Sequence, residues 1–374
     1  MSDKEIKGLR GKIDQIDNQI LDLLNERAGL VLKIGELKQE GNYAFHMLER
    51  ECEIYERLMK RNAGSFPTEG IRDVFREILS ASLSLEKMLK VVYLGPEATF
   101  CHIASLQQFG HSAKFSPAQG IPDIFDEVER GRVDYGVVPI ENSTEGVVNL
   151  TLDLFIDSSL QICAEILLHV SHNLLSKTGR IEDIKRIYSH PQALPQCRNW
   201  LAKNLPHIPV KEVFSTAKAA QHAVEDQNVA AIASAFAARY YCLKTVRKSI
   251  EDVAENFTKF WVIGKKSPGR TGNDKTSIMF SLRDGVGALH QMLEPFSDQG
   301  INLTKIESRP FKKRPWEYIF FIDIEGHVQD ENVSSALDEV KKRSQFLKIL
   351  GSYPRSEVSE KSLLQLPTKE DSER

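Results

Sequence analysis

The sequence predicts a multidomain protein in which three domains of different fold class follow one another. Its 374 residues suffice for two or three domains. Residues 1–90 carry apolar side chains at helical spacing only, whereas residues 91–268 alternate short β-rich runs with helical stretches. Residues 274–356 read as strand, helix, strand, strand, helix, strand. We therefore expect an all-α, an α/β and an α+β domain, followed by a disordered polar tail over 357–374.

Composition excludes several classes of protein. The chain has 49 Lys and Arg residues against 52 Asp and Glu residues, so it lacks the basic excess of a nucleic-acid binder. No apolar run approaches 18 residues, and the N-terminus lacks the apolar core of a signal peptide, so we expect no membrane association. The five cysteines are scattered, which favours a reducing cytoplasm and argues against disulfides and zinc.

The first helix of the all-α domain predicts an intertwined homodimer. It runs from Asp3 to Glu40, 38 residues, or about 57 Å, whereas a compact 90-residue domain is only about 30 Å across. Further helices are expected over 48–62 and 71–90. The long helix must therefore bury its apolar stripe against another chain. The stripe comprises Ile13, Ile16, Ile20, Leu23, Leu30, Ile34 and Leu37.

Charged side chains interrupt this stripe and predict an anion site. Arg27 stands in the middle of the stripe, and Lys38 lies about 20° around the helix from it. Arg10 is roughly 25 Å away along the axis, so it would serve the partner's pocket. The spacing of the other two helices turns Glu51, Ser82 and Glu86 inward. Such a pocket suits a small dianion with hydroxyl and ether oxygens, although an interhelical salt bridge between Arg27 and Glu51 is the simpler alternative.

The run LRGKIDQIDNQILDLLNERAGLVLKIGELK, followed by ERECEIYERL, resembles the all-helical chorismate mutases over nearly all of residues 5–90. The resemblance implies that chorismate is bound by cations from two chains and rearranged to prephenate. It implies that Glu51 holds the ring hydroxyl, that Ser82 binds a carboxylate, and that Lys38 and Glu86 are the catalytic groups at the ether oxygen. The implied cations are Arg10 (from the partner), Arg27, Lys38 and Arg50.

Two positions depart from that family's pattern. Met47 stands where Asp is frequent, so one hydroxyl contact is in doubt. Glu86 stands where several members have a Gln that donates to the ether oxygen. Because a carboxylate cannot donate a hydrogen bond, we expect mutase activity to rise as the pH falls and Glu86 takes up a proton. Wild type and Glu86→Gln with the same flat pH profile would refute this expectation.

Four loops of the α/β domain carry polar groups at strand ends or helix starts, which are natural anion sites in a largely parallel sheet. They are GPEATFCH (95–102), PIENSTEG (139–146), SHPQ (189–192) and ENFTKF (255–260). For any single loop, ordinary turn chemistry is the alternative. Together they resemble prephenate dehydratase over residues 91–266.

That resemblance implies two α/β lobes like a type II periplasmic binding protein, with prephenate in the cleft and conversion to phenylpyruvate. Thr258 matches the family's essential hydroxyl. His190 is a candidate proton source, with a structural histidine as the alternative. Cys101, Ala98 and Lys259 depart from the usual Ser, Gly and Arg. The implied prephenate-binding residues are Thr99, Glu141, Asn142, Ser143, Ser189, His190, Gln192, Phe257 and Thr258.

The C-terminal pattern is the ferredoxin-like βαββαβ arrangement, which by itself hosts many functions. The segment GVGALHQML places small residues at a helix start, where backbone N–H groups can receive a carboxylate. With TKIESRP it resembles the phenylalanine-binding ACT domains of this enzyme family. The resemblance implies feedback inhibition by phenylalanine, and a purely structural dimerisation module is the alternative. The implied effector residues are Gly287, Ala288, Leu289, Glu307, Ser308, Arg309 and Pro310.

Taken together, the resemblances predict a bifunctional enzyme of phenylalanine biosynthesis, on the shikimate pathway, that converts chorismate to prephenate and prephenate to phenylpyruvate. We expect a cytoplasmic homo-oligomer, a dimer or a tetramer, that uses no cofactor and no metal. Two alternatives stay open at this point. One is a monofunctional dehydratase whose helical domain only dimerises, and the other is a non-enzymatic sensor of aromatic metabolites.

Overall fold

The computed structural model describes residues 3–41, 46–282, 285–311 and 317–356. The tail expected over 357–374 lies outside the described residues. The chain divides into two compact units, one comprising residues 1–89 with 109–114 and the other the remaining residues. Each unit is described by itself below.

The first unit is helical, as expected. Its elements are α1 (Asp3–Gly41), α2 (Leu48–Arg61) and α3 (Thr68–Glu86). The prediction for the third helix was wrong at both ends, because it begins at Thr68 and stops at Glu86. Lys87 already has extended backbone, and Lys90 opens the strand that follows. The β-favouring run of Val91, Val92 and Tyr93 therefore prevails over helical propensity.

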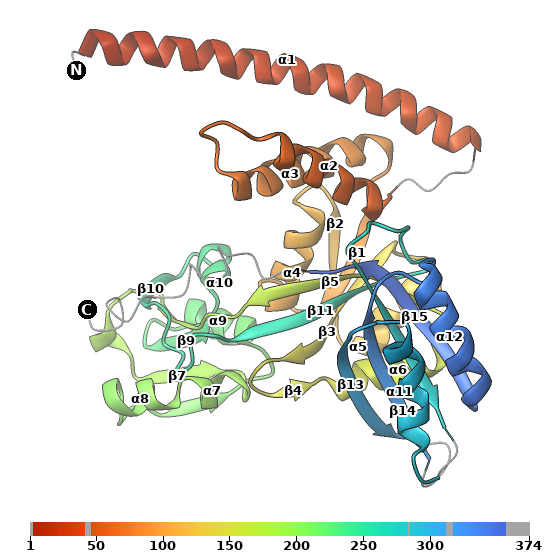
Figure 1. The fold of residues 1–374 in the computed structure, drawn as a ribbon. Helices are drawn as coiled ribbons and strands as arrows, with labels where there is room; N and C mark the ends of the chain where they lie inside the picture. Colours follow the sequence, from red (N-terminus) through yellow and green to blue (C-terminus); the bar gives the residue numbers. More distant parts are fainter. Residues whose placement is uncertain (1–2, 42–45, 283–284, 312–316, 357–374) are drawn as a thin grey trace. The chain divides into compact units, whose positions relative to one another are not determined.

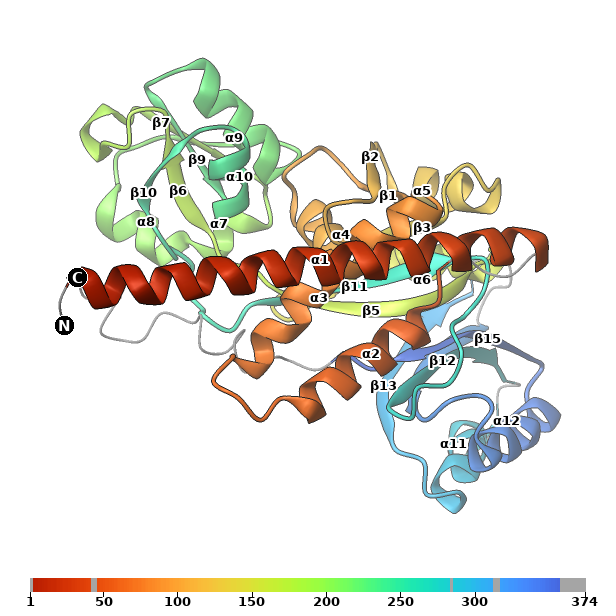
Figure 2. The same cartoon turned by 90° about the horizontal axis from the view of Figure 1, so that it is seen from above.

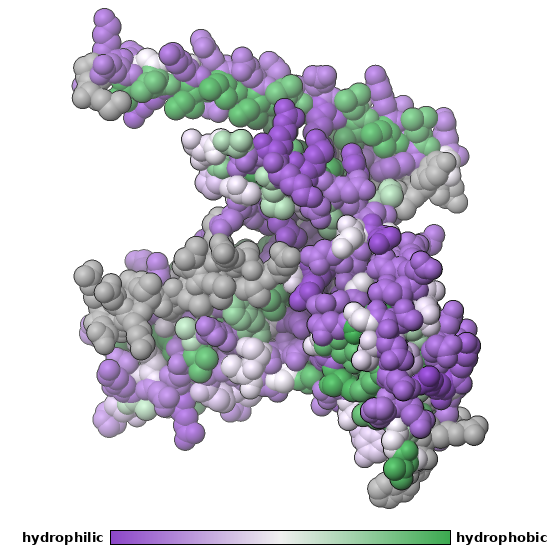
Figure 3. Space-filling view, in the orientation of Figure 1, coloured by the Kyte–Doolittle hydropathy of each residue, from purple (hydrophilic) through white to green (hydrophobic). Residues whose placement is uncertain are grey.

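Helix α1 presents two different faces. Arg27, Gly35 and Lys38 contact α3. Gly35 is the one buried residue of α1, and a Cβ there would lie 3.1 Å from Glu86 Cγ, so a larger residue would need Glu86 to shift. The apolar stripe noted in the sequence is exposed along the described chain, from Ile13 at 56% to Leu37 at 65%. Figure 3 shows this hydrophobic band running along the helix.

The α/β domain, in the second unit, consists of two lobes (Figure 2). The first lobe has strand order β2-β1-β3-β11-β5, with β4 beside β3, and the second has the order β10-β6-β9-β7-β8. The chain passes between the lobes twice, from β5 to β6 and from β10 to β11. This two-lobed fold is the one predicted.

The first lobe contains β1 (Lys90–Leu94), α4 (Phe100–Phe109), β2 (Lys114–Ala118), α5 (Ile121–Glu129), β3 (Tyr135–Asn142), β4 (Gly146–Val147), α6 (Asn149–Asp157), β5 (Gln161–His169) and β11 (Phe257–Gly264). The second contains β6 (Asn173–Ser176), a short 3₁₀ turn (Ile181–Asp183), β7 (Arg186–Ser189), α7 (Ala193–Gln196), α8 (Arg198–Asn204), β8 (Val210–Glu212), α9 (Thr216–Glu225), β9 (Val229–Ala233), α10 (Ala235–Tyr240) and β10 (Lys244–Arg247).

The expectation of largely parallel sheets was wrong, because both sheets are mixed. Strand β1 runs parallel to β3, whereas β11 is antiparallel to both β3 and β5. In the second lobe β7 is parallel to β8 and β9, whereas β6 is antiparallel to β9 and β10. The second passage between lobes explains β11, since the returning strand enters the first sheet against the direction of β3.

The C-terminal domain has the predicted βαββαβ order. Its strands form one antiparallel sheet in the order β13-β14-β12-β15, with α11 and α12 packed together on it (Figure 1). The elements are β12 (Asp274–Ser281), α11 (Ala288–Asp298), β13 (Leu303–Pro310), β14 (Tyr318–Glu325), α12 (Glu331–Arg343) and β15 (Phe346–Pro354).

The central strand β12 is buried on both faces, and one of these faces packs on the first lobe. Ile278 and Phe280 pack with the two helices, whereas Met279 joins the core of the first lobe. Every residue of β12 is consequently buried. A buried ion pair reinforces the junction: Lys275 Nζ lies 2.8 Å from Glu165 Oε1 on β5.

Candidate active sites

A polar cluster lies between α1 and α3 of the helical unit. Arg27 Nη1 donates to Ser82 Oγ, and Lys38 Nζ lies 2.8 Å from Glu86 Oε2. Burial lowers the pKa of Arg27 while Glu86 raises it, and the guanidinium stays charged at neutral pH. Four of the residues expected around chorismate, namely two cations, a hydroxyl and a carboxylate, are thus brought together within one chain.

Three other expected chorismate ligands lie away from this cluster. Arg10 is exposed, farther toward the N-terminus of α1. Arg50 is also exposed and pairs with Glu53 at 2.6 Å. Glu51 pairs with His46 at 3.0 Å, so the simpler alternative of an Arg27–Glu51 bridge is not what the structure shows. One chain therefore supplies only part of the pocket that the resemblance implies.

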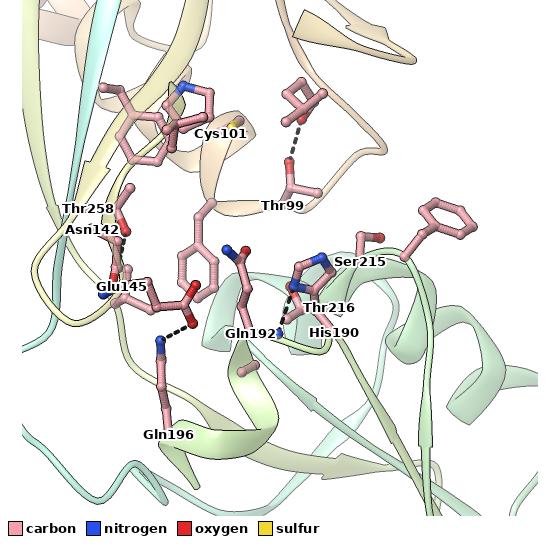
Figure 4. Close-up of a pocket in the computed structure, with 18 of the residues that line it drawn as sticks. Thr99, Cys101, Asn142, Glu145, His190, Gln192, Gln196, Ser215, Thr216 and Thr258 are labelled. Atoms are coloured by element: carbon pink, nitrogen blue, oxygen red, sulfur yellow. Dashed lines mark hydrogen bonds between the residues drawn. The ribbon is translucent and has the colours of Figure 1, made fainter. Parts of the chain in front are cut away.

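A cavity of about 400 Å³ lies between the two lobes of the α/β domain (Figure 4). We refer to it as the interlobe cavity. Its size suits a small metabolite. Five of the residues expected to bind prephenate line it: Thr99, Asn142, His190, Gln192 and Thr258.

The other four expected prephenate ligands do not line the cavity. Glu141 pairs with Lys305 of the C-terminal domain at 2.9 Å. Ser143 Oγ accepts from Phe257 N at 3.0 Å, which ties two of the expected residues to each other. Ser189 is fully buried, and its hydroxyl donates to a main-chain carbonyl in β9. Their motifs shape the site, but these side chains support it rather than face a ligand.

The Thr258 hydroxyl is held in a defined orientation. Asn142 Nδ2 donates to Thr258 Oγ1 at 2.8 Å. The orientation of the Asn142 amide is fixed in turn, since its Oδ1 accepts from the N–H groups of Thr144 and Glu145. Because Thr258 accepts this bond, its own proton is available to a ligand in the cavity.

Sequence reasoning missed several residues of the cavity wall, of which Glu145 and Gln196 matter most. Glu145 belongs to PIENSTEG, and it faces Gln192 and His190 of the second lobe (Figure 4). Gln196 Nε2 reaches across from α7 to Glu145 Oε1 at 3.2 Å. Gln196 stands only four residues beyond SHPQ, so helical spacing from that motif was the signal that could have found it.

Two helix N-termini open onto the cavity. Thr99 precedes α4, and Ser215 caps α9 by accepting from Lys218 N at 2.9 Å. Thr99, Phe100, Ser215 and Thr216 all line the cavity. The described lining contains no Lys or Arg side chain. The positive ends of the two helix dipoles are therefore the main attraction for anions within this wall.

Burial shifts the pKa values of two cavity side chains in opposite directions. It raises the pKa of Glu145, although hydrogen bonds from Gln196 and Gln192 oppose this effect. Burial lowers the pKa of His190, which keeps the imidazole neutral at neutral pH. Gln192 N donates to His190 Nδ1 at 3.2 Å, so the neutral ring carries its proton on Nε2. Glu145 is consequently easier to protonate than an ordinary carboxyl group, whereas neutral His190 is a weak proton donor.

The structure shows the surroundings of the three residues that depart from the dehydratase pattern. Ala98 has φ 64°, in the left-handed region where the more usual glycine is unstrained. Lys259 lies 3.5 Å from Glu141 and does not line the cavity, so losing the bidentate guanidinium fork does not change the cavity wall. Cys101 lines the cavity, and burial raises the pKa of its thiol to about 12, so it is a neutral thiol.

In the C-terminal domain, Gly287 precedes α11 with φ 75°, a conformation that favours glycine. Arg309 of the ESRP segment pairs with Asp153 of the first lobe at 2.9 Å. The expected effector residues thus fall in two segments, the start of α11 and strand β13. Of these side chains, Arg309 is committed to the neighbouring lobe.

Three family models match the chain in succession: chorismate mutase type II over residues 9–87, prephenate dehydratase over 91–268 and the ACT domain over 276–342. A bifunctional chorismate mutase/prephenate dehydratase of Aquifex aeolicus is 52% identical over 361 residues, covering 96% of this chain and all of the relative. The chain belongs to the family of bifunctional chorismate mutase/prephenate dehydratases.

Other comparisons agree with this membership. The bifunctional relative from Pseudomonas aeruginosa is 42% identical and covers 95% of this chain and all of its own length. The crystal structure of an Arthrobacter aurescens prephenate dehydratase in complex with L-Phe is 34% identical. It covers 73% of this chain and 94% of its own, with a TM-score of 0.67. The expectation of an enzyme with both activities and an ACT domain is therefore confirmed, and the monofunctional and sensor alternatives are not supported.

No helix among the described residues is long and apolar enough to cross a membrane. Within the same residues, no group of three or more His, Cys, Asp or Glu side chains is arranged to hold a metal ion.

Proposed function

We propose that the cluster between α1 and α3 is the mutase site. The rearrangement of chorismate is unimolecular and needs no nucleophile, so the protein has to fix the reactive conformer and stabilise charge on the ether oxygen. Lys38 and Glu86 are the proposed catalytic groups for that oxygen. Arg27 and Ser82 hold a carboxylate. The observation that supports this assignment is the convergence of all four side chains.

A second copy of the chain completes the mutase site in this proposal. The exposed apolar stripe of α1 is the surface that the partner covers. Arg10 of the partner enters the pocket, and Arg50 and Glu51 turn toward the substrate when it binds. The protein is then a homodimer or a tetramer made of two such dimers. We also propose a cytoplasmic location, which the five free cysteines of the described structure support.

The interlobe cavity is the proposed dehydratase site. Prephenate carries two carboxylates, and two helix N-termini, at Thr99 and Ser215, open onto the cavity to receive them. Thr258, oriented by Asn142, donates to the departing ring hydroxyl. Gln192 and His190 contact the substrate from the second lobe. The observation that carries this proposal is the oriented hydroxyl of Thr258 on a cavity whose anion-binding groups come from both lobes.

Glu145 is the proposed acid for dehydration. The bond between the ring of prephenate and the carboxylate on that ring breaks, and carbon dioxide is released. The electron pair of that bond moves into the ring, which becomes aromatic as the bond to the hydroxyl breaks. The departing hydroxide takes the Glu145 proton and leaves as water. Prephenate and one proton thus give phenylpyruvate, carbon dioxide and water, and solvent reprotonates Glu145.

Replacing Glu145 by Gln should lower kcat for prephenate by about 10²-fold, because the amide fills the same space but supplies no proton. A group with a raised pKa stays protonated to higher pH, so wild-type kcat should fall as the pH rises through that pKa. The variant should lack this fall. The measurement is phenylpyruvate formation from supplied prephenate across pH, and an unchanged profile in Glu145→Gln would assign the proton to another group.

Phenylalanine regulates the enzyme through the ACT domain, and we propose that it binds at the two matching segments of that domain. The start of α11, preceded by Gly287, receives its carboxylate. Strand β13 supplies the other contacts, at an interface between two ACT domains. The proposed residues are Gly287, Ala288, Leu289, Glu307, Ser308, Arg309 and Pro310.

A further inference from the structure

Strand β13 of the ACT domain has two faces with different surroundings. Its residues alternate strictly between partly buried and exposed positions. Lys305, Glu307 and Arg309 share the partly buried face, while Ile306 and Ser308 lie on the exposed one. Two cations of the inner face reach the dehydratase domain through ion pairs. A single strand therefore carries part of the effector motif and two contacts to the catalytic domain.

The Lys305 pair is the closer of the two to the dehydratase site. Lys305 Nζ lies 2.9 Å from Glu141 Oε2, and the two side chains are only 12% and 33% exposed. Lys259 approaches the same carboxylate at 3.5 Å. Burial raises the pKa of Glu141, but the two lysines outweigh it and hold the pKa below its usual range. Loss of Lys305 would leave a partly buried carboxylate with one weaker cationic contact.

Glu141 precedes Asn142, the residue that orients the Thr258 hydroxyl. In the pairing of β11 with β3, Lys259 lies opposite Glu141, and the next pair along is Thr258 opposite Asn142. Asn142 is the residue that donates to Thr258 Oγ1. Movement of the end of β3 would therefore displace the Asn142 amide relative to Thr258.

The Arg309 pair holds the other end of the same segment. Arg309 Nη2 lies 2.9 Å from Asp153 Oδ1, with side chains 12% and 18% exposed. Asp153 is on α6, and the residues just before that helix, Val147 and Val148, line the interlobe cavity. The two ion pairs thus fasten β13 to both ends of residues 141–153, the segment that contains Asn142 and Glu145.

We propose that Lys305 of the ACT domain is a positioning residue for dehydration: by fixing Glu141, it keeps Asn142 and Thr258 aligned in the interlobe cavity. Phenylalanine acts through the same pair. An effector that binds β13 more tightly in a shifted position draws Lys305 away from Glu141 and misaligns the hydroxyl. This inference rests on the proposed roles of Thr258 and Asn142.

The test compares full-length variants for both activities. Lys305→Gln should lower kcat/KM for prephenate about tenfold and weaken inhibition by phenylalanine, while the mutase activity of the same protein stays unchanged. Lys305→Arg, which keeps the charge, should stay within about twofold of wild type. Lys342→Gln is the matched control, because it removes an exposed ACT-domain ion pair, with Glu339 at 2.6 Å, on the opposite end of the domain's sequence.

A double-mutant cycle identifies the route of the effect. If Lys305 acts through Asn142, adding Lys305→Gln to the Asn142→Ala variant should lower kcat/KM for prephenate by less than about twofold further. Additive losses would overturn the proposal, as would a wild-type kcat/KM in Lys305→Gln. If that variant fails to fold, Glu141→Gln breaks the same pair from the other side and gives the same test. Absence of prephenate turnover in the wild type would instead refute the proposed function itself.

Discussion

Thr258→Ala should reduce phenylpyruvate formation from prephenate by about 10³-fold while leaving the mutase activity of the same protein unchanged. Alanine lacks both the hydroxyl and the Cγ2 methyl group of Thr258, so the donor oriented by Asn142 at 2.8 Å is lost. Removal of one preorganised donor to a developing negative charge typically costs 10²- to 10³-fold in kcat. In this reaction the negative charge develops on the oxygen of the ring hydroxyl as it leaves. Steady-state kinetics with each substrate supplied separately measure both effects.

Thr258→Ser provides the matched control, because it retains the hydroxyl and loses only the methyl group. It should keep a substantial part of the dehydratase activity. Equal loss in the two variants would show that side-chain shape rather than the donor matters at this position. Loss of mutase activity in either variant would contradict the modular organisation, since Thr258 belongs to the α/β domain.

Lys38→Met should reduce mutase activity by a similar factor, about 10²- to 10³-fold, with little effect on the conversion of supplied prephenate. Lys38 is the cation that pairs with Glu86 at 2.8 Å, so its removal takes away the charge that we propose to face the ether oxygen. Met keeps an unbranched side chain of similar length. The rate of chorismate disappearance is the measurement.

Mixed dimers of two variants test whether two chains share the mutase pocket. Lys38→Met protomers should regain mutase activity when they are unfolded and refolded together with Arg10→Ala protomers. A mixed dimer has one pocket with both mutations and one with neither, because Arg10 comes from the partner. Recovery of about a quarter of wild-type activity is expected for random pairing. A mixture no more active than its two components would refute the shared pocket.

Helical periodicity predicted the long first helix but not the division of its surface. Arg27 and Lys38 were correctly placed near each other, because they lie on one face of a single helix. Arg50 turned outward to Glu53, a local pair that no spacing rule distinguishes from an inward position. The apolar stripe was predictable as a stripe, and the structure shows it exposed.

In the dehydratase site, contacts between residues distant in sequence could not be predicted from motifs. PIENSTEG and ENFTKF were visible as motifs, yet the contact between Glu145 and Gln196, 51 positions away in the other lobe, exists only in the folded chain. The antiparallel entry of β11 was likewise invisible, since alternating strands and helices suggest parallel pairing. Lys305 and Glu141 lie 164 positions apart, and only the packing of one domain on another brings them together.

The most direct test of the account is to incubate the purified protein with chorismate and resolve the products by chromatography, with and without phenylalanine. Phenylpyruvate should form through prephenate, and added phenylalanine should suppress it. Accumulation of prephenate alone in the absence of phenylalanine would contradict the assignment of the interlobe cavity. Turnover of supplied prephenate without turnover of chorismate would contradict the mutase site between α1 and α3.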